Sequence, residues 1–286
     1  AAVPADAYVL VHCRDFASLR TRAERNDWYR LLAAPEGEPF LSELMLGFRE
    51  KTHTEPDDLL AMARELAGEV VFFDTGTVAG FLAEPPANRA VLTDLMRQWM
   101  PRGDAALRRT FELGGGSVEL VAWPDELDGW SGRAGHFAAF LDHPRALAIW
   151  SGDDSASVVS TLTAGVTALG TGERAPLVDS YLAEGGGRAS GVELFVDFTP
   201  FVARAEAALK ATVEDVLPDP TSLLGLEAGT WLHATADLSA GSHVDGRARL
   251  RLPPDTLAAR LADTFEALPG TLPADRSEEH TSELQS

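Results

Sequence analysis

The stretch Glu69–Glu84, EVVFFDTGTVAGFLAE, decides the fold class of this chain. Its two apolar runs, Glu69–Asp74 and Val78–Glu84, are rich in β-branched and aromatic residues and are separated by Thr-Gly-Thr. Short apolar runs on either side of a glycine-containing loop are typical of a β-hairpin. The segment that follows, Ala87–Met100, has apolar residues at helical spacing. The stretch therefore predicts a hairpin followed by a helix.

The same order of elements is predicted twice more along the chain. The second set is His136–Asp142, Ala146–Ser151 and the helix Ser155–Leu169, and the third is Thr230–Leu238, Val244–Leu252 and the helix Asp255–Phe265. Little sequence identity accompanies this repetition, so we interpret it as a repeated plan. Because hairpins give antiparallel strands, we expect an α+β fold: a mostly antiparallel sheet built from repeated strand–strand–helix units, with the helices packed on one face.

Further strands and helices are predicted between these units. The strands are Tyr8–Cys13, Arg108–Leu113, Ser117–Trp123 and Val192–Phe198, and the helices are Phe16–Arg25, Trp28–Ala34, Glu38–Lys51, Pro56–Leu66 and Pro200–Thr212. Asp27 is placed to cap the helix that begins at Trp28, and Asp153 or Asp154 to cap the helix at Ser155, since short acidic side chains accept hydrogen bonds from free helical N–H groups.

The expected domain organisation is a single α+β domain over residues 1–271, and the repeated plan raises the alternative of two similar halves, about 1–132 and 133–271. Residues 272–275 (LPAD) resemble residues 3–6 (VPAD), so we expect them to begin a second, truncated copy. Residues 276–286 (RSEEHTSELQS) match the translation of a common sequencing adapter and are expected to be a non-native tail.

The composition fits a folded acidic protein. Hydrophobic residues make up 45% of the chain, charged residues 24%, and the net charge is −20. A field of this sign repels nucleic acid and anionic membranes, so another protein or a basic peptide is the expected partner. No apolar run reaches the roughly 18 residues of a membrane span, and the single cysteine, Cys13, has no cysteine to pair with.

Motifs for several chemistries are absent from the sequence. A phosphate-binding loop needs Gly-Lys-Ser/Thr, but Lys51 and Lys210 follow Glu and Leu. GxGxxG and HExxH do not occur, and the segment GWSGR at 129–133 lacks the last glycine of a hydrolase elbow. We therefore expect no cofactor and no bound metal.

The candidate catalytic residues are His136, Asp142 and His233. His136 and Asp142 are six residues apart on one predicted strand and should share a face. With His233, and with His143 or His243 nearby, they would form a metal or acid–base site if the hairpins converge. The alternative is structural, because an Asp-His pair before a proline is common in hairpin turns.

His12 and Cys13 form a second polar group at the end of the first predicted strand. Adjacent residues of a strand point to opposite faces, so these two side chains cannot share a metal ion. The expected role of this pair is a strand end with a small buried cysteine.

The opening of the chain resembles a known family. Val3–Val11 (VPADAYVLV), Asp15–Arg20 (DFASLR) and Glu38–Leu41 (EPFL) are similar to the start of a family of exported bacterial proteins, of the planctomycete and myxobacterial type, that carry a domain of unknown function. This resemblance implies export, with a signal peptide or lipid anchor upstream of Ala1. It implies no enzymatic activity.

These observations favour a non-enzymatic, extracytoplasmic protein of the periplasm or cell envelope with an interaction role. A first alternative is a hydrolase whose site is built from scattered His and Asp residues. A second alternative is a binding module that attracts cationic peptides or metal ions to its acidic surface.

Overall fold

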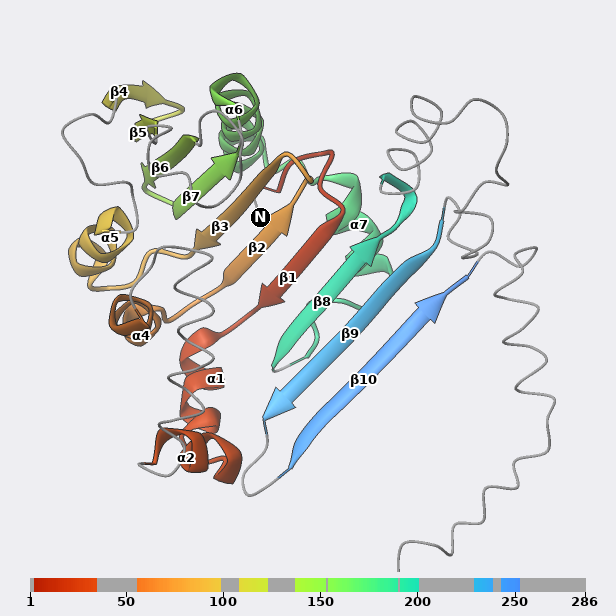
Figure 1. Cartoon of the computed structure of the whole chain (residues 1–286). Helices are drawn as coiled ribbons and strands as arrows, with labels where there is room; N and C mark the ends of the chain where they lie inside the picture. Colours follow the sequence, from red (N-terminus) through yellow and green to blue (C-terminus); the bar gives the residue numbers. More distant parts are fainter. Residues whose placement is uncertain are drawn as a thin grey trace, which may run out of the picture.

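The computed structural model describes residues 3–34, 56–98, 108–122, 137–152, 154–189, 191–200, 229–238 and 243–252. Ten strands form one sheet in the order β10-β9-β8-β1-β2-β3-β7-β6-β5-β4, and neighbouring strands are antiparallel throughout (Figure 1). The strands are β1 (Val9–Cys13), β2 (Val70–Asp74), β3 (Val78–Ala83), β4 (Arg108–Leu113), β5 (Gly116–Ala122), β6 (Phe137–His143), β7 (Ala146–Gly152), β8 (Val192–Asp197), β9 (Trp231–Leu238) and β10 (Val244–Arg251). The helices are α1 (Phe16–Ala23), α2 (Asp27–Ala33), α4 (Pro56–Glu65), α5 (Arg89–Gln98), α6 (Ser155–Thr171) and α7 (Pro176–Ala183).

The three predicted hairpins are confirmed. β2 pairs with β3, β6 with β7 and β9 with β10, each along its length. In the first hairpin Gly76 has a φ of 78°, which glycine adopts without strain, and the Thr75 hydroxyl accepts a hydrogen bond from the Val78 N–H at 2.9 Å. The α+β fold class and the antiparallel sheet follow from these pairings.

The expectation that the helices pack on one face is wrong. Val158 and Leu162 of α6 and Leu177 of α7 pack with Val71, whereas α4 and α5 belong to a separate core cluster with the neighbouring Val70. Because consecutive strand residues point to opposite faces, the two sets of helices cover opposite faces of the sheet. Both faces therefore need apolar cover, which explains why β6 is buried at consecutive positions.

Helices follow the first two hairpins in the expected order, but the two sets of elements are not arranged alike. The first and second hairpins meet through β3 and β7, where Phe81 pairs with Ile149. α5 and α6, which follow these hairpins, lie on opposite faces. The strands of residues 1–132 (β1-β2-β3 and β5-β4) are interleaved in the sheet with those of residues 133–271 (β10-β9-β8 and β7-β6). One sheet therefore joins both segments.

One expected helix cap is displaced by a residue. The Asn26 side chain, and not that of Asp27, accepts from the Tyr29 N–H at 3.3 Å, and Asp27 is already the first residue of α2. Asp154 caps α6 as expected and accepts from the Ser157 N–H at 2.8 Å. Hydrogen bonding from the Ser157 side chain, and then from its backbone N–H, lowers the pKa of Asp154.

Several expectations lie outside the described residues. These are the caps and segments at Asp153, Glu38–Lys51, most of Pro200–Thr212, Asp255–Phe265, 272–275 and 276–286. Within the described part of the chain, no helix has both the length and the apolar character needed to cross a bilayer.

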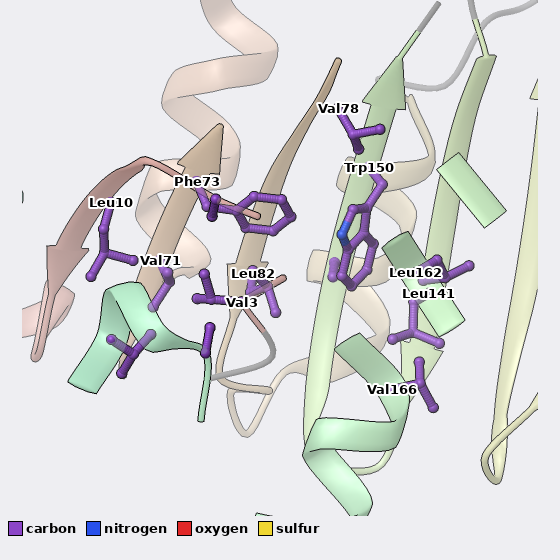
Figure 2. Packing of buried hydrophobic residues seen from close by; sticks show 14 of the residues in the cluster. Val3, Leu10, Val71, Phe73, Val78, Leu82, Leu141, Trp150, Leu162 and Val166 are labelled. Atoms are coloured by element: carbon purple, nitrogen blue, oxygen red, sulfur yellow. The ribbon is translucent and has the colours of Figure 1, made fainter. Parts of the chain in front are cut away.

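The larger core lies between the sheet and the helices α6 and α7. Trp150 and Phe73 are both fully buried, with ring centroids 6.2 Å apart (Figure 2). Phe73 pairs with Gly80 on the neighbouring strand, and its ring occupies the place where a Cβ atom at position 80 would lie. The absence of a side chain at Gly80 therefore makes room for a core aromatic.

Candidate functional site

The structure does not bring the sequence-predicted candidates Asp142 and His233 together. His233 lies on β9 and Asp142 on β6, six strand spacings apart, which corresponds to about 29 Å across the sheet. Asp142 forms an ion pair with Arg89 of α5, which fixes that helix against the sheet. His136 lies outside the described residues.

Two further histidines have backbone or turn partners. The Nδ1 atom of His143 accepts from the backbone N–H of Arg145 at 3.1 Å, as the turn interpretation of this segment requires. The backbone carbonyl of His243 accepts from the side chain of Asn26 at 3.0 Å. Among the residues that the structure describes, the candidates for the alternative hydrolase site are therefore not brought together.

His233 instead belongs to a buried polar network on the α7 side of the sheet. Its Nε2 atom lies 3.1 Å from Oε2 of Glu193 on β8, and the side chains are 8% and 2% exposed. A carboxylate that is so deeply buried must accept hydrogen bonds to offset its lost hydration. The backbone N–H groups of Gly187 and Ala189 supply two, at 3.2 and 3.1 Å.

His12 joins the same network from β1. It pairs with Glu193 across the two strands, so both side chains point to the same face. Its Nε2 atom lies 2.9 Å from Oε1 of Glu69, and its Nδ1 atom lies 2.8 Å from the Tyr181 hydroxyl. The hydrogen bond from His12 lowers the pKa of Glu69.

Tyr181 of α7 links the two His–Glu pairs. Its ring makes edge contacts with the rings of both His12 and His233, each with centroids 5.7 Å apart. Its hydroxyl oxygen accepts from the Gly187 N–H at 2.6 Å. Burial, together with the adjacent charge of Glu193, raises the pKa of Tyr181 well above its usual range. The tyrosine therefore remains a neutral donor at any ordinary pH.

The donors and acceptors of this network, His12, Glu69, Tyr181, Glu193 and His233, satisfy one another. The Glu69 carboxylate accepts from Nε2 of His12, and Nδ1 of His12 shares a hydrogen bond with the Tyr181 hydroxyl. Glu193 accepts from His233 and from two backbone N–H groups. The arrangement ties α7 to three strands of the sheet through hydrogen bonds and ring contacts.

Sequence reasoning missed three members of this network. Tyr181 was missed because the short helix α7 lies between glycine-rich segments and carries few helix signals beyond Pro176. Glu193 carried a usable signal, since it shares a strand face with the fully buried Phe195. A charged residue on the buried face of a strand predicts a partner in the core. Glu69 was assigned only to the end of a hairpin strand.

Cys13 points away from the network, as strand alternation predicts for the neighbour of His12. It is buried, and burial raises the pKa of its thiol, so the reactive thiolate is disfavoured. In the described ranges, no group of three or more His, Cys, Asp or Glu side chains is placed to hold a metal ion.

The face that carries this network continues to the open edge of the sheet at β10. One row of paired residues runs across the last four strands on this side of the sheet: His12 on β1, Glu193 on β8, Thr235 on β9 and Arg247 on β10. On the same face, Arg249 pairs with His233 and Arg251 with Trp231. We call Arg247, Arg249 and Arg251 the arginine row.

All eight residues of β10 are exposed to solvent. Arg251 lies 3.4 Å from Glu184, at the end of α7. Arg247 and Arg249 have no acidic partner among the residues whose placement is described. The opposite face of β10 carries the apolar Val244 and Leu250, which are 52% and 56% exposed. One face of the edge strand therefore carries the arginine row beside a single acidic residue, Asp245, and the other face carries no charge.

No protein-family model matches the chain, and no curated protein sequence matches it. Among solved structures, crystal form III of TP0453 is similar, with a TM-score of 0.42 and 10% identity over 93% of this chain and 84% of that one. Crystal form I of TP0453 gives a TM-score of 0.38 with 9% identity, over 92% and 83% of the two chains. At these values the similarity is a resemblance in chain arrangement alone.

Proposed function

We propose that this protein is a non-enzymatic interaction protein of the bacterial cell envelope, and that it binds partner proteins at the edge strand β10. The observation that carries the proposal is the position and exposure of this strand. β10 is the last strand of the sheet and, within the described residues, pairs with β9 only.

An edge strand presents backbone N–H and C=O groups that point away from the sheet at every second residue. A partner in an extended conformation can pair with these groups and extend the sheet by one strand. β10 has eight residues, which is long for an edge strand and provides a full-length template for such pairing.

The opposite edge of the sheet offers a weaker template. On β4, Arg108 donates a hydrogen bond to Glu119 of the neighbouring strand at 2.7 Å, so its charge is satisfied within the chain. We therefore place the binding surface at β10. The resemblance to exported proteins supports a location outside the cytoplasm.

Site-specific photo-crosslinking in the source bacterium tests this function. A crosslinking residue replaces Leu250 on β10 in one strain and Val91 on α5, which is 47% exposed, in the control strain. We expect a defined envelope protein to crosslink at position 250 only. That protein, once purified, should protect the backbone amides of β10 from hydrogen exchange.

Equal crosslinking at both positions, or a purified partner that leaves the β10 amides unprotected, would contradict binding at this edge. The location is tested separately, by fusing the full-length gene to a reporter enzyme that is active only outside the cytoplasm. An inactive reporter would contradict the envelope assignment without bearing on the binding surface.

A further inference from the structure

We infer that β10 binds an acidic, amphipathic β-strand: an extended segment whose carboxylates and apolar side chains alternate. This inference rests on the proposed function and specifies the chemistry of its partner. It is carried by the charge pattern of β10, whose sign is opposite to that of the whole chain.

The arginine row is the first element of the argument. Arg247, Arg249 and Arg251 occupy alternate positions, so their side chains project from one face of the edge strand. The chain has a net charge of −20, with 44 acidic residues available to neutralise 24 cationic ones. An exposed row of arginines is therefore unusual on this molecule, and it includes two residues without an acidic partner in the described part.

The alternate face of β10 sets the second requirement. This face carries four uncharged residues: Val244, Gly246, Ala248 and Leu250. An added strand with carboxylates on the arginine face would place its other side chains beside Ala248 and Leu250. Small or branched apolar residues fit these positions, since cross-strand neighbours pack against each other.

Charge also argues against a second copy of this chain as the occupant. Antiparallel pairing of two β10 strands places arginines near arginines on the shared face, and like charges opposite each other destabilise a sheet. Pairing of β10 with β4 of another copy would bring the arginine row beside Arg108 and Arg109. An acidic strand removes this repulsion and forms charge-assisted hydrogen bonds with the guanidinium groups.

Peptide titration against the full chain tests the inference. Three capped eight-residue peptides alternate valine with glutamate, threonine or lysine, and affinities are measured by calorimetry at low and high salt. We expect the glutamate peptide to bind, the threonine peptide to bind about tenfold more weakly, and the lysine peptide not to bind. Raising the salt concentration should weaken only the glutamate peptide.

Two matched double variants locate the charge effect. R247T/R249T removes the two arginines without described acidic partners, and threonine maintains β propensity. R64T/R174T removes the same net charge from exposed positions elsewhere. We expect the first variant to lose about tenfold in affinity for the glutamate peptide, and the second to bind as the unmodified protein does.

The outcomes separate the two proposals. Equal binding of the glutamate and threonine peptides overturns the inferred partner chemistry and leaves edge binding intact. If no peptide binds and R247T/R249T self-associates in analytical ultracentrifugation, the arginines serve only to keep the edge unpaired, and both proposals fail. Equal loss of affinity in both double variants would show a diffuse field effect and overturn the assignment to β10.

Discussion

His12 and Glu193 lie directly opposite each other on β1 and β8 and point to the same face of the sheet. Tyr181 of α7 contacts both: its hydroxyl is 2.8 Å from Nδ1 of His12, and the charge of Glu193 helps to raise its pKa. One helix thus covers two buried charged or ionisable groups and satisfies them. Removing one of these groups takes a hydrogen-bonding or electrostatic partner from its neighbour in a buried site.

Replacing Tyr181 by phenylalanine should destabilise the fold. The substitution keeps the ring but removes the hydroxyl, which leaves Nδ1 of His12 without its partner and the Gly187 N–H with Glu193 alone. We expect a loss of about 1–3 kcal/mol in the free energy of unfolding, measured by urea denaturation. Tyr29→Phe is the control, since Tyr29 is 44% exposed, and it should change stability by less than about 0.5 kcal/mol. Equal effects of the two changes would contradict the network.

The same tyrosine predicts how stability depends on alkaline pH. Because the pKa of Tyr181 is raised in the folded state, the folded protein keeps a proton that the unfolded chain loses. This contribution is fully present below the unfolded pKa of about 10 and is lost as the pH rises above it. Stability should therefore fall more steeply between about pH 10 and 11 in the natural protein than in the Tyr181→Phe variant. Parallel curves would show that the tyrosine titrates normally.

Glu193 is the most deeply buried charge of the network, and its replacement by glutamine should cost more. A glutamine amide presents an NH₂ group where the carboxylate accepts from Gly187, Ala189 and His233. We expect a loss of about 2–4 kcal/mol, measured by thermal and urea unfolding. Glu184→Gln is the matched control on the same side of the sheet; its exposed pair with Arg251 should contribute less than about 1 kcal/mol.

Glu69 predicts the behaviour at acid pH. Its pKa is lowered by the hydrogen bond from His12, so its contribution is present above the unfolded pKa of about 4.3 and is lost as the pH falls through the folded pKa. The side chain is 49% exposed, so solvent screening keeps this contribution small. Glu69→Gln should lower stability by a small, constant amount above about pH 4.3, and should flatten the further loss of stability below that pH. If stability falls equally with pH below about pH 4.3 in the variant and in the unmodified protein, the pair with His12 does not stabilise the fold.

The sheet could be predicted from sequence because its information is local. Each hairpin consists of two short apolar runs around a turn, as in Glu69–Glu84, and the pairing partner is the next run along the chain. The order of hairpins in the sheet is not local information. Pairing of β1 with both β2 and β8 joins segments far apart in the chain, and no residue pattern specifies it.

The polar network could not be predicted for the same reason. Its members come from β1, the residue before β2, α7, β8 and β9, and they meet because β1 lies between β2 and β8. Strand alternation carries a signal that the sequence analysis did not use: His12 and Glu193 are charged or ionisable residues on buried strand faces. The one-sided helix arrangement was predicted wrongly because apolar residues on both faces of β6 were not taken as a signal for helices on both sides.

The contact between Phe73 and Gly80 supplies the last prediction. A Cβ atom at position 80 would overlap the Phe73 ring, which is fully buried and packs against Trp150. Gly80→Ala should therefore destabilise the protein by about 1–3 kcal/mol through overpacking, measured by urea unfolding. The control is Gly170→Ala in α6, where nothing lies within 4 Å of the added atom. Because alanine favours helices over glycine, that change should be neutral or stabilising by up to about 1 kcal/mol. A neutral Gly80→Ala variant would mean that Phe73 has space to move, and that the core between β2 and β3 is looser than the described contacts indicate.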